Sequence, residues 1–128
     1  MKKYFFLAAL GATSFAAKAQ LTTQRWEATI SIPSPTECFL QFDHDTMKLF
    51  SKDMPTEPVE SMRFTAANDT LTLVKLDGQS PCDNAPAVYK ATVKDNMLQF
   101  ASIADACDVR VNALIETPWR PYTAGGSQ

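Results

Sequence analysis

The chain has 128 residues, with 12 Lys and Arg against 14 Asp and Glu, a formal net charge of −2 and 45% hydrophobic residues. This length accommodates one small domain. The acidic balance argues against a nucleic-acid-binding protein, because phosphate backbones are bound by basic surfaces.

The first 19 residues have the pattern of a secretory signal peptide. Lys2 and Lys3 precede an apolar run from Tyr4 to Leu10, and Ala17 and Ala19 supply small residues before a cleavage site. The run is far shorter than the ~20 residues of a membrane span, so we expect no membrane insertion. We predict cleavage after Ala19 and an exported protein, periplasmic or extracellular. The mature chain then has 9 basic and 14 acidic residues, a net charge of about −5.

Residues 25–32 give the strongest strand signal. Trp26, Ala28, Ile30 and Ile32 alternate with polar residues, as expected for a strand with one face in a core. Prolines at 33 and 35 end this strand. Similar alternation predicts further strands over 36–42, 47–50, 61–66, 70–76, 89–94 and 97–104.

Turn-forming residues separate these segments. The corners are predicted at 43–45, 52–58, 68–69, 77–81 and 95–96, where Asn, Asp, Gly and Pro gather. Residues 108–117 fit both strand and helical spacing, and their β-branched content favours a strand. The last residues, 122–128, have little to bury and are predicted to be a disordered tail.

Short strands at this spacing predict an all-β domain over residues 20–121. An antiparallel up-and-down β-barrel of seven to eight strands would bury the inward faces and leave no unpaired edge. A two-sheet β-sandwich would also bury these faces, and the pattern does not distinguish the two.

Three cysteines in an exported chain indicate one disulfide and one free thiol. Cys82 precedes and Cys107 follows the hairpin of residues 89–104, so the two sulfurs should reach the same end, and we predict a bond between them. Cys38 is in phase with Leu40 and Phe42, which favours a buried thiol over a nucleophile.

Seven large apolar side chains share the inward phase and are candidates for lining a ligand cavity: Phe42, Met47, Met62, Phe64, Leu73, Tyr89 and Phe100. A barrel of eight strands is just wide enough to be filled by side chains or to hold one small ligand. The same residues could therefore form a solid core. A ligand should be small and apolar, oriented by the Tyr89 hydroxyl or a nearby Ser or Thr.

Catalytic patterns are weak, and we expect neither an enzyme nor a cofactor. The chain has one histidine, so a Ser-His-Asp triad has only one candidate base. The triplet Asp43–His44–Asp45 is more typical of a polar turn than of a metal site. Asp83, Asp105 and Asp108 could be considered for calcium, but carboxylates at turns usually accept backbone hydrogen bonds.

The second half of the chain resembles small bacterial lipocalin-like proteins, members of the calycin superfamily. The resemblance lies in the order Cys82, Tyr89-Lys90, Leu98-Gln-Phe100, Asp105-Ala-Cys107-Asp-Val-Arg110, Leu114 and Trp119. It implies a lipocalin-like barrel in which Trp26, on the first strand, packs under the side chain of Arg110. Two glycines usual in the family are replaced, by Gln24 and Val88.

Two functions follow as hypotheses. The first is an exported binding protein that holds a small hydrophobic ligand in the barrel. The second is an envelope interaction protein or protease inhibitor that has no small-molecule ligand and acts through residues 20–25 and the loop 52–58. Oligomeric state and ligand identity have no signal in the sequence.

Overall fold

The computed structural model describes residues 21–123, so the predicted signal peptide lies outside the described residues. The elements in chain order are β1 (Trp26–Ser31), β2 (Pro35–Asp43), β3 (Thr46–Ser51), β4 (Glu60–Ala67), β5 (Thr70–Gly78), β6 (Ala87–Lys94), β7 (Met97–Ala104), α2 (Asp108–Ile115) and β8 (Arg120–Pro121).

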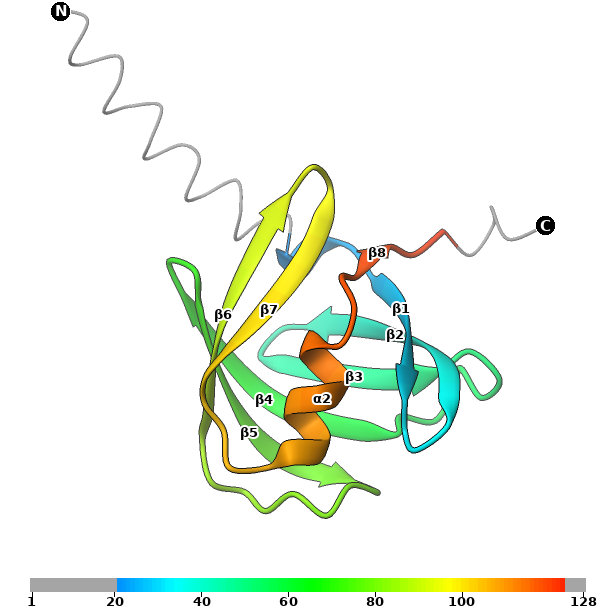
Figure 1. Cartoon of the computed structure of the whole chain (residues 1–128), viewed down its shortest axis with the longest axis horizontal. Helices are drawn as coiled ribbons and strands as arrows, with labels where there is room; N and C mark the ends of the chain where they lie inside the picture. Colours follow the sequence, from blue (N-terminus) through cyan, green and yellow to red (C-terminus); the bar gives the residue numbers. More distant parts are fainter. Residues whose placement is uncertain (1–20, 124–128) are drawn as a thin grey trace, which may run out of the picture.

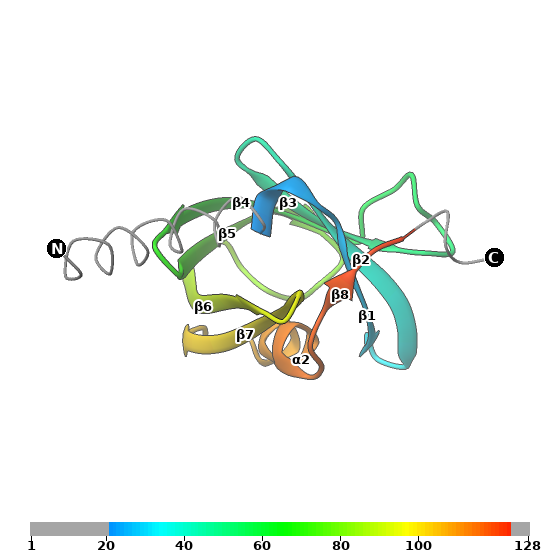
Figure 2. The same ribbon diagram turned by 90° about the horizontal axis from the view of Figure 1, so that it is seen from above.

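All eight strands belong to one antiparallel sheet that curls into a nearly closed barrel. The order is β7-β6-β5-β4-β3-β2-β1-β8, so each strand from β1 to β7 pairs with its neighbours in sequence. Figure 1 shows the strands wrapping around a common interior, and Figure 2 shows the ring from above. The predicted barrel is therefore confirmed, and the two-sheet sandwich is not what forms.

The ring closes through a single bridge between Leu98 of β7 and Trp119, the residue before β8. Leu98 N–H donates to the Trp119 carbonyl at 2.7 Å, and Trp119 N–H donates to the Leu98 carbonyl at 2.8 Å. Beyond this bridge, α2 occupies the gap between β7 and β1 (Figure 1). The barrel is thus sealed by two hydrogen bonds and a helix rather than by a continuous ladder.

The tight turns lie where the sequence predicts them. His44, Asn68, Asp95 and Asn96 have positive φ, a conformation that Asn and Asp tolerate better than most residues. Each of these turns joins two strands through a loop of two residues. The short loops fix the registers of the β2–β3, β4–β5 and β6–β7 hairpins.

The strand favoured for residues 108–117 is wrong, because Asp108–Ile115 form the helix α2. Cys107 is its N-cap residue and Asp108 lies in the first turn, where a negative charge is stabilised by the helix dipole. The Asp105 carboxylate also accepts a hydrogen bond from the Cys107 N–H at 2.8 Å. These local interactions and the burial of Ala113 and Leu114 outweigh the strand preference of the β-branched residues.

Both predictions about the cysteines are confirmed. Cys82 and Cys107 form a disulfide with their Cα atoms 5.5 Å apart. It ties the segment before β6 to the start of α2, at the same end of the hairpin. Cys38 is free and completely buried on the inner face of β2.

A second apolar cluster lies on the outer face of β2 and β3. Phe39 stacks between Phe50 and Tyr122, with ring centroids 4.9 and 4.7 Å away, and the Arg25 guanidinium lies 4.6 Å from the Tyr122 centroid. The Tyr122 N–H also donates to the carbonyl of Arg25 at 2.8 Å. Tyr122, predicted as the first tail residue, is therefore part of the packed domain.

No helix in residues 21–123 has the length and apolar character to cross a membrane.

Candidate functional site

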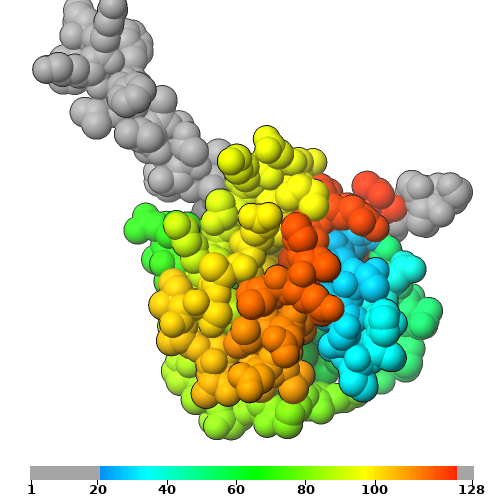
Figure 3. Space-filling view, in the orientation of Figure 1, coloured from blue at the N-terminus to red at the C-terminus, as the bar shows by residue number. Residues whose placement is uncertain are grey.

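A cavity of about 1010 Å³ lies at one end of the barrel. It lies between α2 and the inner faces of β2, β3 and β4. The β1–β2 turn bounds it on one side, and the segment following β5 bounds it on the other. Figure 3 shows α2 (orange) on the surface between β7 (yellow) and β1 (blue). The volume is at the upper end of the range for small-molecule sites, about 300–1,000 Å³.

The inner wall of the cavity is apolar. Leu40, Leu49 and Met62 come from β2, β3 and β4, where the alternation of each strand turns them inward. Ala113 and Leu114 face them from α2. Such a wall favours an apolar molecule, because burying apolar surface is worth about 25 cal/mol per Å².

The mouth of the cavity carries apolar side chains in contact with solvent. Val109 and Ile115 of α2 are 44% and 42% exposed, and both line the cavity. Ile32 and Pro33 lie across from them in the β1–β2 turn. Exposed apolar residues around an opening are typical of sites that admit apolar ligands.

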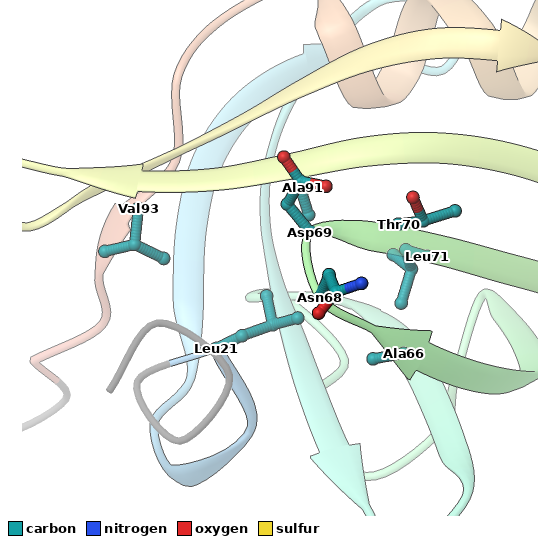
Figure 4. A pocket seen from close by; sticks show the side chains of 8 residues that line it. All are labelled: Leu21, Ala66, Asn68, Asp69, Thr70, Leu71, Ala91 and Val93. Carbon is teal, nitrogen blue, oxygen red and sulfur yellow. The ribbon is translucent and has the colours of Figure 1, made fainter. Parts of the chain in front are cut away.

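The opposite end of the barrel is filled. Figure 4 shows Leu21 between Val93 and the turn formed by Asn68 and Asp69, where a hollow of only about 10 Å³ remains. That space is about enough for one water molecule. The Trp26 indole N–H, completely buried, donates to the Leu21 carbonyl at 3.0 Å and holds this residue in place. Of these two hollows in residues 21–123, the one at the α2 end has the room for a small molecule.

Of the seven residues predicted to line a cavity, only Met62 does so. Met47, Phe64, Leu73, Tyr89 and Phe100 belong to the buried core with Met62, and Phe42 is partly buried and packs against that core. They fill the barrel, which is the alternative that the sequence left open.

Tyr89, expected to orient a ligand, is committed to a buried polar cluster. Its hydroxyl donates to Asp105 Oδ2 at 2.5 Å, and Arg110 donates to both carboxylate oxygens of Asp105, through Nε at 2.7 Å and Nη2 at 2.9 Å. Asp105 is therefore the ion-pair partner of Arg110. The packing of Trp26 under Arg110 that the family resemblance suggests stays a prediction.

Burial and hydrogen bonding set the ionisation of this cluster. Burial, reinforced by the Asp105 carboxylate, raises the pKa of Tyr89 well above its usual range. Burial would also raise the pKa of Asp105, but hydrogen bonds from Arg110, Tyr89 and the Cys107 backbone lower it below its ordinary value. The hydrogen bond to Asp105 raises the pKa of Arg110. Near neutral pH the cluster is a neutral tyrosine beside a closed ion pair, which does not favour proton transfer.

A second buried ion pair borders the cavity. Glu60 lines it, and its carboxylate accepts hydrogen bonds from the Ser80 N–H at 3.2 Å and the Ser80 hydroxyl at 2.6 Å. Lys75 lies 3.4 Å from the same carboxylate and donates to the Ser80 carbonyl at 2.6 Å. Gly78, with φ +145°, leaves this space open, because a Cβ there would come within 2.0 Å of Glu60 Oε1.

The other polar candidates do not converge. In residues 21–123, no three His, Cys, Asp or Glu side chains are placed to bind a metal ion together. Asp83 accepts a hydrogen bond from the Ala85 N–H at 3.0 Å, and Asp105 is bonded to Arg110. His44 and Asp45 lie in the turn between β2 and β3.

Sequence reasoning missed the residues of α2 that line the cavity. Their signal was the helical spacing of Val111, Leu114 and Ile115, which was outweighed by β-branched content. Leu40 was correctly placed on the inner face, but the strand pattern alone does not show which inward residues border empty space.

Comparison with known protein families, with curated proteins and with solved structures gives no significant match to this chain.

Proposed function

We propose that this protein is an exported binding protein that holds a small, largely apolar molecule in the cavity beneath α2. The observation that carries the proposal is the cavity itself, about 1010 Å³ with Leu40, Leu49 and Met62 as its inner wall. The resemblance of the second half of the chain to lipocalin-like proteins agrees with a carrier role. The site differs from the predicted one in its residues, because Met62 is the one member of the predicted set that lines it.

Export is part of the proposal, and it is supported by the disulfide. Cys82 and Cys107 are joined, and disulfides persist mainly in oxidising compartments outside the cytoplasm. The amino-terminal pattern of charged, apolar and small residues supports the same location. Amino-terminal sequencing of the protein recovered from the periplasm or the medium would test it, with Gln20 as the expected first residue.

A binding role fits the chemistry of the cavity better than catalysis does. Its two most buried ionisable residues, Glu60 and Arg110, are each paired with an opposite charge, to Lys75 and Asp105. A general acid or base needs to exchange its proton near neutral pH. Groups held in ion pairs are poorly suited to that exchange.

Titration with N-phenyl-1-naphthylamine, a neutral fluorescent apolar probe, tests the binding function. We expect a saturable rise in fluorescence at about one site per chain. Ala113→Trp should narrow the cavity beneath α2 and weaken binding about tenfold or more, since the indole takes up space beside the apolar inner wall that the ligand needs. Ala101→Trp, on the exposed face of β7, is the matched control and should bind as the original protein does.

Asn112→Trp provides a second variant, because Asn112 lines the cavity but is exposed, so that a large side chain there does not enter the core. The proposal fails if the probe shows no saturable binding, or if both cavity variants, folded by circular dichroism, bind as well as the unsubstituted protein.

An alternative function, inhibition of proteases or binding to an envelope protein, is favoured by the loop between β3 and β4. Met54 is 59% exposed there, and its backbone is fixed by a hydrogen bond from its N–H to the Ser51 carbonyl at 3.0 Å. A large exposed side chain on a fixed loop can enter a partner's pocket. A panel of serine and metalloproteases would test this, with Met54→Asp expected to abolish any inhibition.

A further inference from the structure

The charges around the cavity select the polar end of its ligand. Three ionisable residues line it, the two carboxylates Glu60 and Glu116 and the single cation Arg110. The charged end of a ligand would interact with these three groups. Which ligand charge is favoured therefore depends on which of the groups can still pair with it.

Arg110 is not available to a ligand anion. Two of its nitrogens are bonded to the Asp105 carboxylate at 2.7 and 2.9 Å, and the side chains of both residues are almost completely buried. The third nitrogen, Nη1, has no hydrogen-bond partner, but it is fully buried and therefore does not open into the cavity. An anion could pair with Arg110 only by displacing Asp105, which would leave a carboxylate buried without its partner.

Lys75 is occupied in the same way. It binds the Glu60 carboxylate and both the carbonyl and the hydroxyl of Ser80, and it does not line the cavity. Of this ion pair, Glu60 lines the cavity and Lys75 does not. A carboxylate has more acceptor sites than the bonds described here use, so Glu60 can accept a further hydrogen bond from a ligand donor.

Glu116 adds a negative charge with no cation beside it. Its carboxylate accepts hydrogen bonds from the Ser31 N–H and hydroxyl, each at 3.2 Å, and it forms no ion pair within residues 21–123. The rim is therefore acidic, while both nearby cations are neutralised.

We infer that the cavity takes an amphiphile whose polar end is an uncharged or cationic hydrogen-bond donor, a hydroxyl or an amine, and that it rejects carboxylates. The inference rests on the proposed binding function. Glu60 would accept the donor at the inner wall, and the apolar chain would run along Leu40, Leu49 and Met62 toward the mouth.

Three ligands of equal chain length test the inference: dodecanol below its solubility limit, and dodecylamine and dodecanoate below their micellisation concentrations. Displacement of N-phenyl-1-naphthylamine from the oxidised protein gives their affinities. We expect dodecanol and dodecylamine to compete and dodecanoate to be about tenfold weaker or worse, since an unpaired charge near the rim opposes it. Raising the salt concentration should reduce the preference for the amine over the alcohol.

Charge reversal at the rim identifies the source of the preference. Glu116→Lys should reduce the difference between dodecylamine and dodecanoate by about tenfold, because it replaces a repulsive charge by an attractive one. Glu57→Lys changes the net charge by the same amount on the exposed β3–β4 loop, away from the cavity. It should leave the difference unchanged.

Two results would overturn the inference while the binding function stands. One is a dodecanoate affinity equal to or above that of the other two ligands, and the other is a bound probe that none of the three displaces. Failure of the probe itself to bind would remove the proposed function, and with it this inference.

Discussion

Asp105, which precedes α2, and Arg110, in the first turn of α2, form an ion pair with two hydrogen bonds. Their side chains are only 1% and 6% exposed. Asp105 also accepts the Tyr89 hydroxyl and the Cys107 N–H. One carboxylate therefore joins β6, the disulfide and the helix that covers the cavity.

Removing the cation from this pair should be strongly destabilising. Arg110→Met leaves the Asp105 charge buried without compensation, which costs about 3–5 kcal/mol of unfolding free energy. Urea denaturation at neutral pH measures the loss. Arg63→Met is the control, because Arg63 is 59% exposed, lies 4.0 Å from Asp45 and should cost less than about 1 kcal/mol. Equal losses for the two variants would contradict the assigned role of the pair.

The lowered pKa of Asp105 predicts a stability that falls in acid. The unfolded carboxyl takes up a proton near its ordinary pKa of about 3.9, whereas the folded one resists it to lower pH, so the unfolded state binds more protons. This contribution is complete above the unfolded pKa and is lost as the pH falls through the folded pKa. Urea midpoints between about pH 5 and 2 should decline less steeply for Asp105→Asn, although Glu27, whose pKa is also lowered, keeps part of the slope.

Cys38 should be unreactive in the folded protein. Burial raises its pKa to about 11 and shields the sulfur, so little thiolate is present at pH 8. We expect negligible reaction with an aromatic disulfide reagent in buffer and one thiol per chain in concentrated urea. Rapid labelling of the native protein at pH 8 would show that β2 does not bury this residue.

Reduction of the Cys82–Cys107 bond should weaken both the fold and ligand binding. Its loop spans a sequence separation of 25. Cross-links of this size contribute about 3 kcal/mol by loop-closure arithmetic. Replacing both cysteines by alanine should lower the denaturation midpoint and, because the bond anchors the start of α2, reduce probe affinity. Unchanged affinity in a folded double variant would mean that α2 is positioned without the bond.

Tyr122 should stabilise the barrel from outside. Its ring stacks on Phe39, so Tyr122→Ala is expected to cost about 1–2 kcal/mol, whereas Tyr122→Phe keeps the stacking and should cost much less. Thermal unfolding of the two variants would compare them directly. A similar loss in both would assign the effect to the hydroxyl instead of the ring.

Much of this architecture was accessible from the sequence because it depends on local chemistry. Alternation placed Trp26 and Leu40 inward, and the positive φ tolerated by Asn and Asp located the turns at Asn68 and Asn96. The disulfide followed from the hairpin between its two cysteines.

The cavity could not be predicted in the same way. It exists because residues 108–115 form a helix in the gap between β7 and β1, an arrangement set by tertiary packing and not by strand periodicity. The outer aromatic stack was equally hidden, since Phe39 and Phe50 are out of phase with the inward set and become neighbours only through the β2–β3 register.

The two hydrogen bonds between Leu98 and Trp119 have a mechanical consequence. The strand pairs from β1–β2 to β6–β7 are each joined by a ladder of several residue pairs, and the β1–β8 pair beside the bridge is short. The contact between Leu98 and Trp119 should therefore need the least free energy to separate. We therefore expect the barrel to open first at its carboxyl-terminal edge, next to α2, which borders the cavity. Opening at this edge, which limits the stability of the barrel, would also give a molecule access to the cavity.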